Sequence, residues 1–353
     1  MLETGKVINQ EKKLAIVLFN LGGPDKLSSV RPFLYNLFSD KWIIRAPNII
    51  RKLIAFFISA TRNRLAKSNY SLMGGKSPLL HETTKQKEAL ENELENMGMG
   101  NFKVFISMRY WHPFSKEAVS QIKEFGAESI IYLPLYPHCS SSTTLSSFED
   151  FDKELAKTYP VQDIKKIGCY FDDNDFISSH IELIEEKLKL FENTKKLRIL
   201  FSAHSIPKKF VTQGDPYEWQ INKTYKSIAE SPKISKYETI LCYQSKVGPI
   251  EWLSPSTEHV VEESAKLGYD ILVIPIAFVS EHIETLVELD IEYKQIATKY
   301  DVCYERVDAL GVNKKFIKSL AKYISQANFS DKKVLGLGSD LCPREFKNCL
   351  CRV

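Results

Sequence analysis

The chain has 353 residues, of which 44% are hydrophobic and 26% are charged, and its formal net charge is +4 at pH 7. This composition is typical of a soluble globular protein long enough for two domains, and it gives no reason to expect a nucleic-acid-binding protein. The N-terminal residues have neither the apolar segment of a signal peptide nor the Arg- and Ser-rich character of a transit peptide. We therefore expect a cytoplasmic bacterial protein, with a matured organelle protein as the alternative.

The first half of the chain contains three segments with the pattern of a buried strand followed by a polar loop. They are residues 13–24 (KLAIVLFNLGGP), 102–113 (FKVFISMRYWHP) and 127–144 (AESIIYLPLYPHCSSSTT). Helical patterns separate them, for example at residues 116–125. Strands that alternate with helices predict βαβ units with right-handed crossovers and a parallel sheet.

Residues 30–65 separate the first two of these strands and are rich in large apolar side chains. Their densest apolar part, residues 53–60, is far shorter than the roughly 20 residues of a transmembrane helix. Basic residues flank it, namely Arg51, Lys52, Arg62 and Arg64. The segment is therefore either a plain core helix or an amphipathic lip at the mouth of a pocket, in peripheral contact with the inner membrane.

The second half repeats the pattern of the first. Residues 196–207 (KLRILFSAHSIP), 237–249 (YETILCYQSKVGP) and 269–285 (YDILVIPIAFVSEHIET) match the three earlier segments in the same order. This repetition predicts an α/β fold of two similar doubly wound domains whose loops face a shared cleft. We place the N-terminal domain at 13–148, the C-terminal domain at 149–312, and a C-terminal helix with a cysteine-rich tail at 313–353.

Four glutamates follow the apolar strand at residues 270–279, at spacings of three, four and four. They are Glu281, Glu284, Glu288 and Glu292. This spacing predicts one carboxylate stripe along a helix, with His282 in its first turn. The stripe is either a solvated face or a functional one, where the carboxylates bind a cation or conduct protons.

His204 follows its buried strand just as His282 and Glu284 follow theirs. Two units of one doubly wound fold would bring His204 and Glu284 to the same crevice, at the carboxyl ends of the strands. An imidazole beside a carboxylate is either a metal site or a general-base pair. The glycine pairs at 22–23 and 74–75 form neither a dinucleotide-binding motif nor a P-loop.

Eight motifs together resemble those of ferrochelatases, which insert ferrous iron into protoporphyrin to form protohaem. They are LFNLGGPD, GGKSPL, MRYWHP, YPHCSSSTT, LFSAHSIP, QGDPY, YQSKVGPIEWLSP and PIAFVSEHIETLVELDIEY. They cover nearly the whole chain in family order. The resemblance implies two Rossmann-like, chelatase-type domains that bind no nucleotide, with protoporphyrin IX and Fe²⁺ as substrates.

The resemblance also implies residue roles. His204 and Glu284 would be the catalytic pair and would contact the metal. A proton or metal path would run beside them through Glu281, His282 and Glu288. Porphyrin-binding residues would be Arg62 on the lip, where propionates are held, and Arg109, Tyr110 and Trp252 at the pocket.

Three cysteines cluster at the C-terminus, Cys342, Cys349 and Cys351, and such spacing in an intracellular protein indicates metal ligation rather than disulfides. Some ferrochelatases hold a [2Fe–2S] cluster with three C-terminal cysteines and one distant cysteine, so the resemblance implies a cluster here. Cys139 is our candidate for the fourth ligand and Cys169 is the next. The alternative is that the tail thiols bind nothing.

Several other functions remain open at this stage. A coproporphyrin ferrochelatase or a cobalt chelatase would use similar residues, because nitrogen and oxygen ligands do not define the metal. A two-domain protein that binds a metal or tetrapyrrole without chemistry is the alternative from another class. The oligomeric state is open between a monomer and a homodimer.

Overall fold

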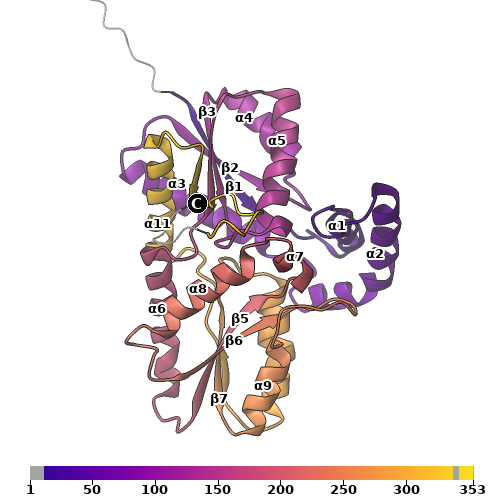
Figure 1. Ribbon diagram of the computed structural model, residues 1–353, viewed down its shortest axis with the longest axis vertical. Helices are drawn as coiled ribbons and strands as arrows, with labels where there is room; N and C mark the ends of the chain where they lie inside the picture. The colour runs from indigo at the N-terminus through magenta and orange to yellow at the C-terminus, as the bar shows by residue number, and fades with distance from the viewer. Residues whose placement is uncertain (1–11, 337–341, 353) are drawn as a thin grey trace, which may run out of the picture.

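The computed structural model describes residues 12–336 and 342–352 and contains two parallel β-sheets, one above the other along the long axis (Figure 1). The first sheet has the order β2-β1-β3-β4-β9. Its strands are β1 (Leu14–Asn20), β2 (Phe102–Met108), β3 (Ser129–Pro134), β4 (Asp163–Cys169) and β9 (Val334–Gly336). The second has the order β6-β5-β7-β8, with β5 (Leu197–His204), β6 (Glu238–Gln244), β7 (Asp270–Pro275) and β8 (Tyr304–Arg306).

The two sheets repeat one topology. In each, the first strand of the unit lies between the second and the third, and the fourth lies beyond the third. β1 is buried along its whole length, and β5 is buried except at its ends. The prediction of two similar α/β units with parallel sheets is thus confirmed. In each sheet the strand order reverses beside the first strand of the unit, β1 or β5, and folds of this kind bind ligands at that point.

Helices cover both faces of the sheets and join the two units. α3 (Leu79–Asn96), α4 (Ser115–Phe125) and α5 (Ser146–Thr158) belong to the first unit, and α6 (Asn174–Leu188), α8 (Tyr217–Ala229) and α9 (Thr257–Lys266) to the second. The short helices α7 (Lys208–Thr212) and α10 (Lys294–Thr298) follow β5 and η4. α11 (Lys314–Phe329) packs against α3 and α6, so it contacts both units (Figure 1).

The first sheet continues beyond residue 148, where we had expected the second domain to begin. β4 pairs with β3 from Ser129↔Asp163 to Tyr132↔Lys166, and β9 pairs with β4. The sheet therefore takes one strand from the middle of the chain and one from near its end. Alternation of strands and helices cannot reveal this, because strand partners are chosen in three dimensions.

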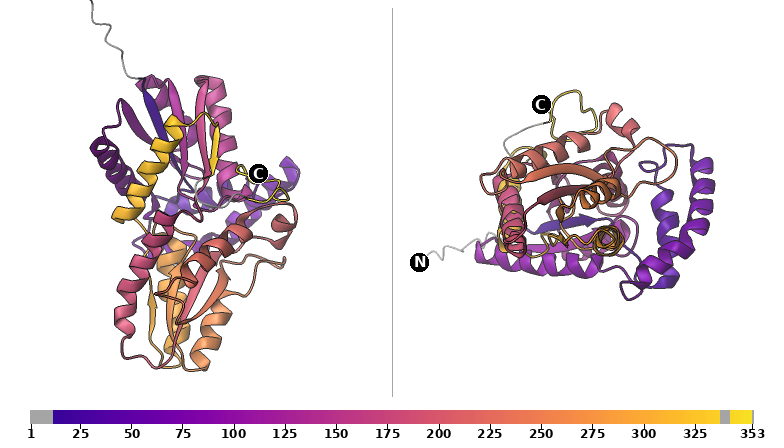
Figure 2. Two further views of the ribbon diagram at one scale, coloured as in Figure 1. Left: turned by 60° about the vertical axis from the view of Figure 1, so that its left-hand side comes forward. Right: turned by 90° about the horizontal axis from the view of Figure 1, so that it is seen from below.

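The segment predicted to be either a core helix or an amphipathic lip forms a helical hairpin. α1 (Val30–Phe38) packs against α2 (Asn48–Ser71), and the pair projects from one side of the molecule (Figures 1 and 2). α2 exposes large apolar side chains, among them Ile49, Leu53 and Phe57 at 76%, 55% and 63%. Among the described residues, none of the helices combines the length and the apolar character needed to cross a bilayer.

A π-helix follows the third strand of each unit. η2 (Ser141–Leu145) follows β3, and η4 (Glu284–Tyr293) follows β7. We expected an α-helical stripe that included Glu281 and began near His282. This expectation is wrong, because both residues lie in the loop before η4. π-helical turns are rare and occur mainly at functional sites, so the two η elements mark both units for closer inspection.

Candidate active site at the carboxyl end of the second sheet

His204 and Glu284 lie side by side although 79 residues separate them. His204 is the last residue of β5 and Glu284 is the first residue of η4, so both stand at the carboxyl edge of the second sheet. His204 Nδ1 lies 2.8 Å from Glu284 Oε2. The two side chains are 39% and 25% exposed, so the pair is accessible to a ligand.

Each member of the pair stabilises the charged form of the other. Burial alone would lower the pKa of His204, but the charge of Glu284 and the hydrogen bond to it raise that pKa above its ordinary value. Burial would likewise raise the pKa of Glu284, but the charge and hydrogen bond of His204 hold it well below its usual range. A proton accepted by His204 is therefore stabilised by the carboxylate.

His282 stands on the other side of the same carboxylate. Its Nε2 lies 3.8 Å from Glu284 Oε2, and its ring packs against Phe278 with the ring centres 4.4 Å apart. The residue is 8% exposed, and its Nδ1 has no hydrogen-bond partner among the described residues. Glu284 thus lies between two imidazoles.

Glu288 is held firmly, one η4 turn beyond Glu284. Its carboxylate accepts hydrogen bonds from Ser245 N at 2.9 Å, Tyr293 Oη at 2.6 Å and Gln244 Nε2 at 3.1 Å. Gln244 Nε2 also donates to the backbone carbonyl of Glu284 at 3.1 Å. The loop after β6 therefore fixes the first turns of η4.

Glu292 extends the row towards the lip. Its Oε1 lies 3.3 Å from Asn69 Nδ2 on α2, and burial together with the charge of Glu288 raises its pKa. Tyr70 of α2 is buried, and burial with a contribution from the charge of Glu284 raises its pKa. The C-terminal end of α2 thus lies beside the carboxylate row.

Glu281 points into a different set of contacts. Arg306 Nη1 donates to its Oε1 at 2.9 Å, and Ala309 N donates to the same oxygen at 2.8 Å. Arg306 also binds Asp290 through Nε at 2.6 Å and Nη2 at 2.7 Å. The guanidinium is buried and attracts the nearest carboxylates, which explains why Glu281 leaves the stripe that its spacing predicted.

The sequence matches the family model for ferrochelatase over residues 13–328. The ferrochelatase of Rickettsia felis is 50% identical over 350 residues, with 97% of this chain and 99% of that protein covered. The ferrochelatase of a Wolbachia strain from Drosophila simulans is 48% identical over 310 residues, with 88% and 98% covered. The chain belongs to the ferrochelatase family. It is an enzyme of haem synthesis that inserts ferrous iron into a porphyrin.

The fold agrees with this membership. The solved structure of SirB from Bacillus subtilis with Fe³⁺ superimposes with a TM-score of 0.52 at 9% identity, covering 90% of this chain and 95% of that chain. At so low an identity the likeness concerns the fold alone. It supports a chelatase-type arrangement of the two α/β units in this ferrochelatase.

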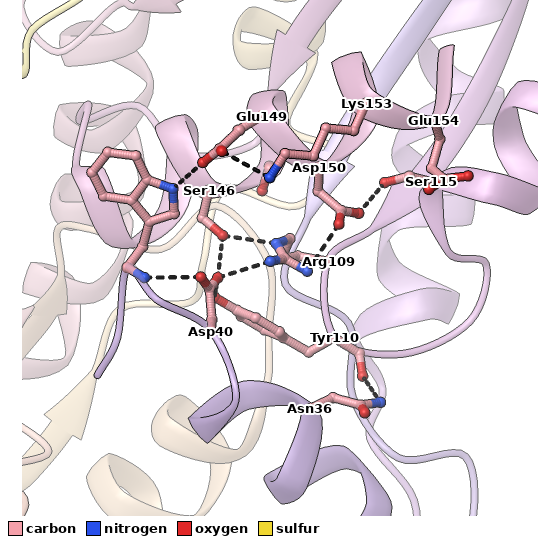
Figure 3. A network of polar contacts seen from close by, with 12 residues as sticks. Asn36, Asp40, Arg109, Tyr110, Ser115, Ser146, Glu149, Asp150, Lys153 and Glu154 are labelled. Carbon is pink, nitrogen blue, oxygen red and sulfur yellow. Dashed lines mark hydrogen bonds and ion pairs between the residues drawn. The ribbon is translucent and has the colours of Figure 1, made fainter. Parts of the chain in front are cut away.

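Two of the predicted porphyrin residues, Arg109 and Tyr110, lie in a polar network around the buried Asp40 (Figure 3). Arg109 donates to Asp40 Oδ2 at 3.0 Å and to Ser146 Oγ at 2.7 Å, and it lies 3.5 Å from Asp150. The fully buried Tyr110 donates to the same Asp40 oxygen at 2.8 Å. These contacts tie the loop after α1 to the start of α5, and none of them involves His204 or Glu284.

The other two predicted porphyrin residues are separate from this network. Arg62 is half-buried on α2. Trp252 is half-buried in the loop after β6, where its backbone pairs with that of Pro207, and its Nε1 is buried without a hydrogen-bond partner among the described residues.

Five cysteines from distant parts of this ferrochelatase form one buried cluster with Phe171. They are Cys139, Cys169, Cys342, Cys349 and Cys351. Hydrogen bonds from the thiols of the other four, that of Cys139 foremost, lower the pKa of Cys349. Within residues 12–336 and 342–352, no three His, Cys, Asp or Glu side chains are arranged to hold a single metal ion. The thiols instead contact one another.

Two glycines make room for the cysteine-rich tail. A Cβ at Gly168 would collide with Cys351 Sγ, and a Cβ at Gly214, where φ is +91°, would lie 2.9 Å from Lys347 N. Both segments therefore accept the tail only with glycine at these positions.

Sequence reasoning missed four residues that shape these sites: Asp40, Tyr293, Arg306 and Gln220, whose amide contacts Cys139 N and Cys342 Sγ. Only Arg306 carried a usable signal, because a charged side chain within a short buried strand requires partners. The other three are ordinary residue types whose importance comes from contacts across the fold.

Proposed function

We propose that His204 is the base that accepts the pyrrole protons during metal insertion and that Glu284 orients it. The observation that supports this most strongly is the 2.8 Å contact between His204 Nδ1 and Glu284 Oε2, in a pair whose side chains are partly exposed. With Nδ1 bound to the carboxylate, Nε2 is the nitrogen that faces substrate. Direct ligation of iron by His204 and Glu284 is the alternative role for the same atoms.

Protoporphyrin IX is a flat apolar ring whose two N–H protons must leave as Fe²⁺ enters. A base whose protonated form is stabilised by a neighbouring carboxylate suits this step. Binding energy that distorts the ring would expose its nitrogens and resemble the transition state. His282, Glu288 and Glu292 then form the path by which protons leave or iron arrives. Glu281 has a different role, because its ion pair with Arg306 fixes the loop before η4.

The α1–α2 hairpin is proposed to cover the porphyrin. Its apolar surface fits a ring with apolar substituents, which favours protoporphyrin over the more acidic coproporphyrin. Arg62 on α2 would bind a propionate, and the indole ring of Trp252 would contact the porphyrin at the pocket. Arg109 and Tyr110 would act on the porphyrin through the position of the hairpin, because their own polar atoms are bound to Asp40.

The exposed apolar residues of α2 are also proposed to touch a membrane surface from the cytoplasmic side. Ile49, Leu53 and Phe57 lie near Arg51 and Lys52, a combination that suits anionic lipid headgroups. All seven cysteines are free, which agrees with a reducing compartment.

The cysteine cluster is proposed to hold a [2Fe–2S] group through Cys342, Cys349, Cys351 and a fourth thiol. The donor set fits, because the group takes four thiolates and this pocket contains five buried thiols. Interactions with all three tail thiols raise the pKa of Cys169, and interactions with Cys349 and Cys351 raise the pKa of Cys139. The number of tail thiols that it contacts favours Cys169 as the fourth ligand. The position of Cys139 in the motif YPHCSSSTT favours Cys139 instead.

Two serine variants decide the ligand. Loss of the thiolate-to-iron absorption bands in only one of Cys139→Ser and Cys169→Ser identifies the fourth ligand. A freshly purified protein without such bands, and without iron and sulfide by analysis, would refute the cluster.

The proposed role of His204 is tested by metallation of protoporphyrin IX with Fe²⁺. His204→Ala should lower the rate constant kcat by about 10²- to 10⁴-fold, the range for a general base. Porphyrin binding, followed by fluorescence quenching, should be retained. His259→Ala, at an exposed position on α9, is the matched control and should keep full activity. Unchanged turnover in His204→Ala would refute the mechanism.

A further inference from the structure

Gln220 is a fully buried polar residue in the first turns of α8. It lies between two segments that are 203 residues apart in the chain, the loop that carries Cys139 and the tail that carries Cys342. A buried amide needs partners for both its oxygen and its nitrogen. Gln220 finds them in these two segments.

The side chain joins the segments with defined polarity. Its Oε1 accepts a hydrogen bond from Cys139 N at 2.6 Å, and its Nε2 donates to Cys342 Sγ at 2.9 Å. Cys349 Sγ lies 3.9 Å from the same nitrogen. Because the oxygen is bound to a backbone N–H, the amide cannot rotate, and its N–H groups must point at sulfur.

We propose that Gln220 is a positioning residue for the [2Fe–2S] group, whose amide donates to the cysteine sulfurs and fixes the Cys139 loop against the tail. The inference rests on the proposed cluster. Hydrogen bonds to ligand sulfurs stabilise the additional negative charge of the reduced state and so raise the reduction potential. Partners outside the ligand shell also hold the ligands in place, and losing one weakens metal binding.

The same helix also contacts the candidate active site. Tyr217, one turn before Gln220, donates from Oη to the backbone carbonyl of His204 at 3.0 Å. Asp215, just before α8, accepts a hydrogen bond from Ser141 N at 2.8 Å. The start of α8 is therefore a common support for the thiol pocket and for the end of β5.

The test uses full-length Gln220→Leu and Gln220→Glu, with Gln121→Glu at an exposed position of α4 as the matched control. We expect a lower reduction potential in both variants, more so in Gln220→Glu because it adds a negative charge. We also expect bleaching of the cluster by a chelator to be about 10- to 100-fold faster. The control should behave as wild type.

If Gln220→Leu and Gln220→Glu fail to fold, Gln220→Asn is tested in their place. It keeps the amide but is one methylene too short to reach both segments, so it should show the same two changes to a smaller extent. Wild-type potential and bleaching in a folded Gln220 variant that carries the cluster would overturn the proposal while leaving the cluster intact. A wild-type protein without cluster absorption would instead refute the cluster, and with it this role of Gln220.

Discussion

The two α/β units have the same strand order but use their polar side chains in opposite ways. In the first, Arg109, Tyr110 and Ser146 all bind the carboxylate of Asp40, whose side chain is only 2% exposed. In the second, His204 and Glu284 bind each other and remain partly exposed. The comparison teaches that the fold supplies two equivalent edges, and that reactivity belongs to the edge whose charged groups are paired without being enclosed.

The strongest test of this contrast removes the carboxylate of Glu284, which orients His204. Glu284→Gln should lower kcat for iron insertion by about 100-fold, because His204 loses the charge that stabilises its protonated form. The thermal midpoint should change little, since the pair is part-exposed. A loss of stability without loss of activity would show that this edge, too, is structural.

The matching change in the network around the buried Asp40 should have the reverse outcome. Asp40→Asn leaves the guanidinium of Arg109 without its buried partner and should cost about 3 kcal/mol in the free energy of unfolding. Urea denaturation measures this cost. The activity of the folded fraction should fall far less than in Glu284→Gln, and an equal fall would mean that the two edges act together in catalysis.

A milder change tests whether the loop before η4 depends on the geometry of Arg306. Arg306→Lys keeps the charge but loses the two-point contact with Asp290, so the free energy of unfolding should fall by about 1–2 kcal/mol. Arg306→Leu is expected to cost more, because it leaves Glu281 and Asp290 without the guanidinium that pairs with both. Equal stability of wild type and Arg306→Leu would contradict the ion-pair account.

The smallest expected effect is a shift in pH dependence. The raised pKa of His204 means that the free base is lost as pH falls through that value, so the rate should decline on the acid side. In Glu284→Gln the pKa of His204 should fall, and the acid limb of the residual activity should move to lower pH. If the acid limb of the pH–rate profile lies at the same pH in Glu284→Gln as in wild type, His204 is not the titrating base.

Much of the fold followed from local patterns. Runs such as those of β1 and β7 are strands because they are continuously apolar and rich in branched residues, and the helix at 116–125 follows from its periodicity. Repetition of strand, loop and helix was enough to predict two similar units. The contact of His204 with Glu284 was also accessible, because residues that end neighbouring parallel strands meet at one edge.

The sequence alone determined which residues stand at the two edges, because a strand's direction and its neighbours place its last residue. Only the tertiary structure decided what each side chain binds there. Glu281 is drawn to Arg306, Arg109 to Asp40, and five cysteines from three regions converge beside Gln220. Such pairings depend on which charges and thiols become buried together, and burial is a property of the packed molecule rather than of any segment.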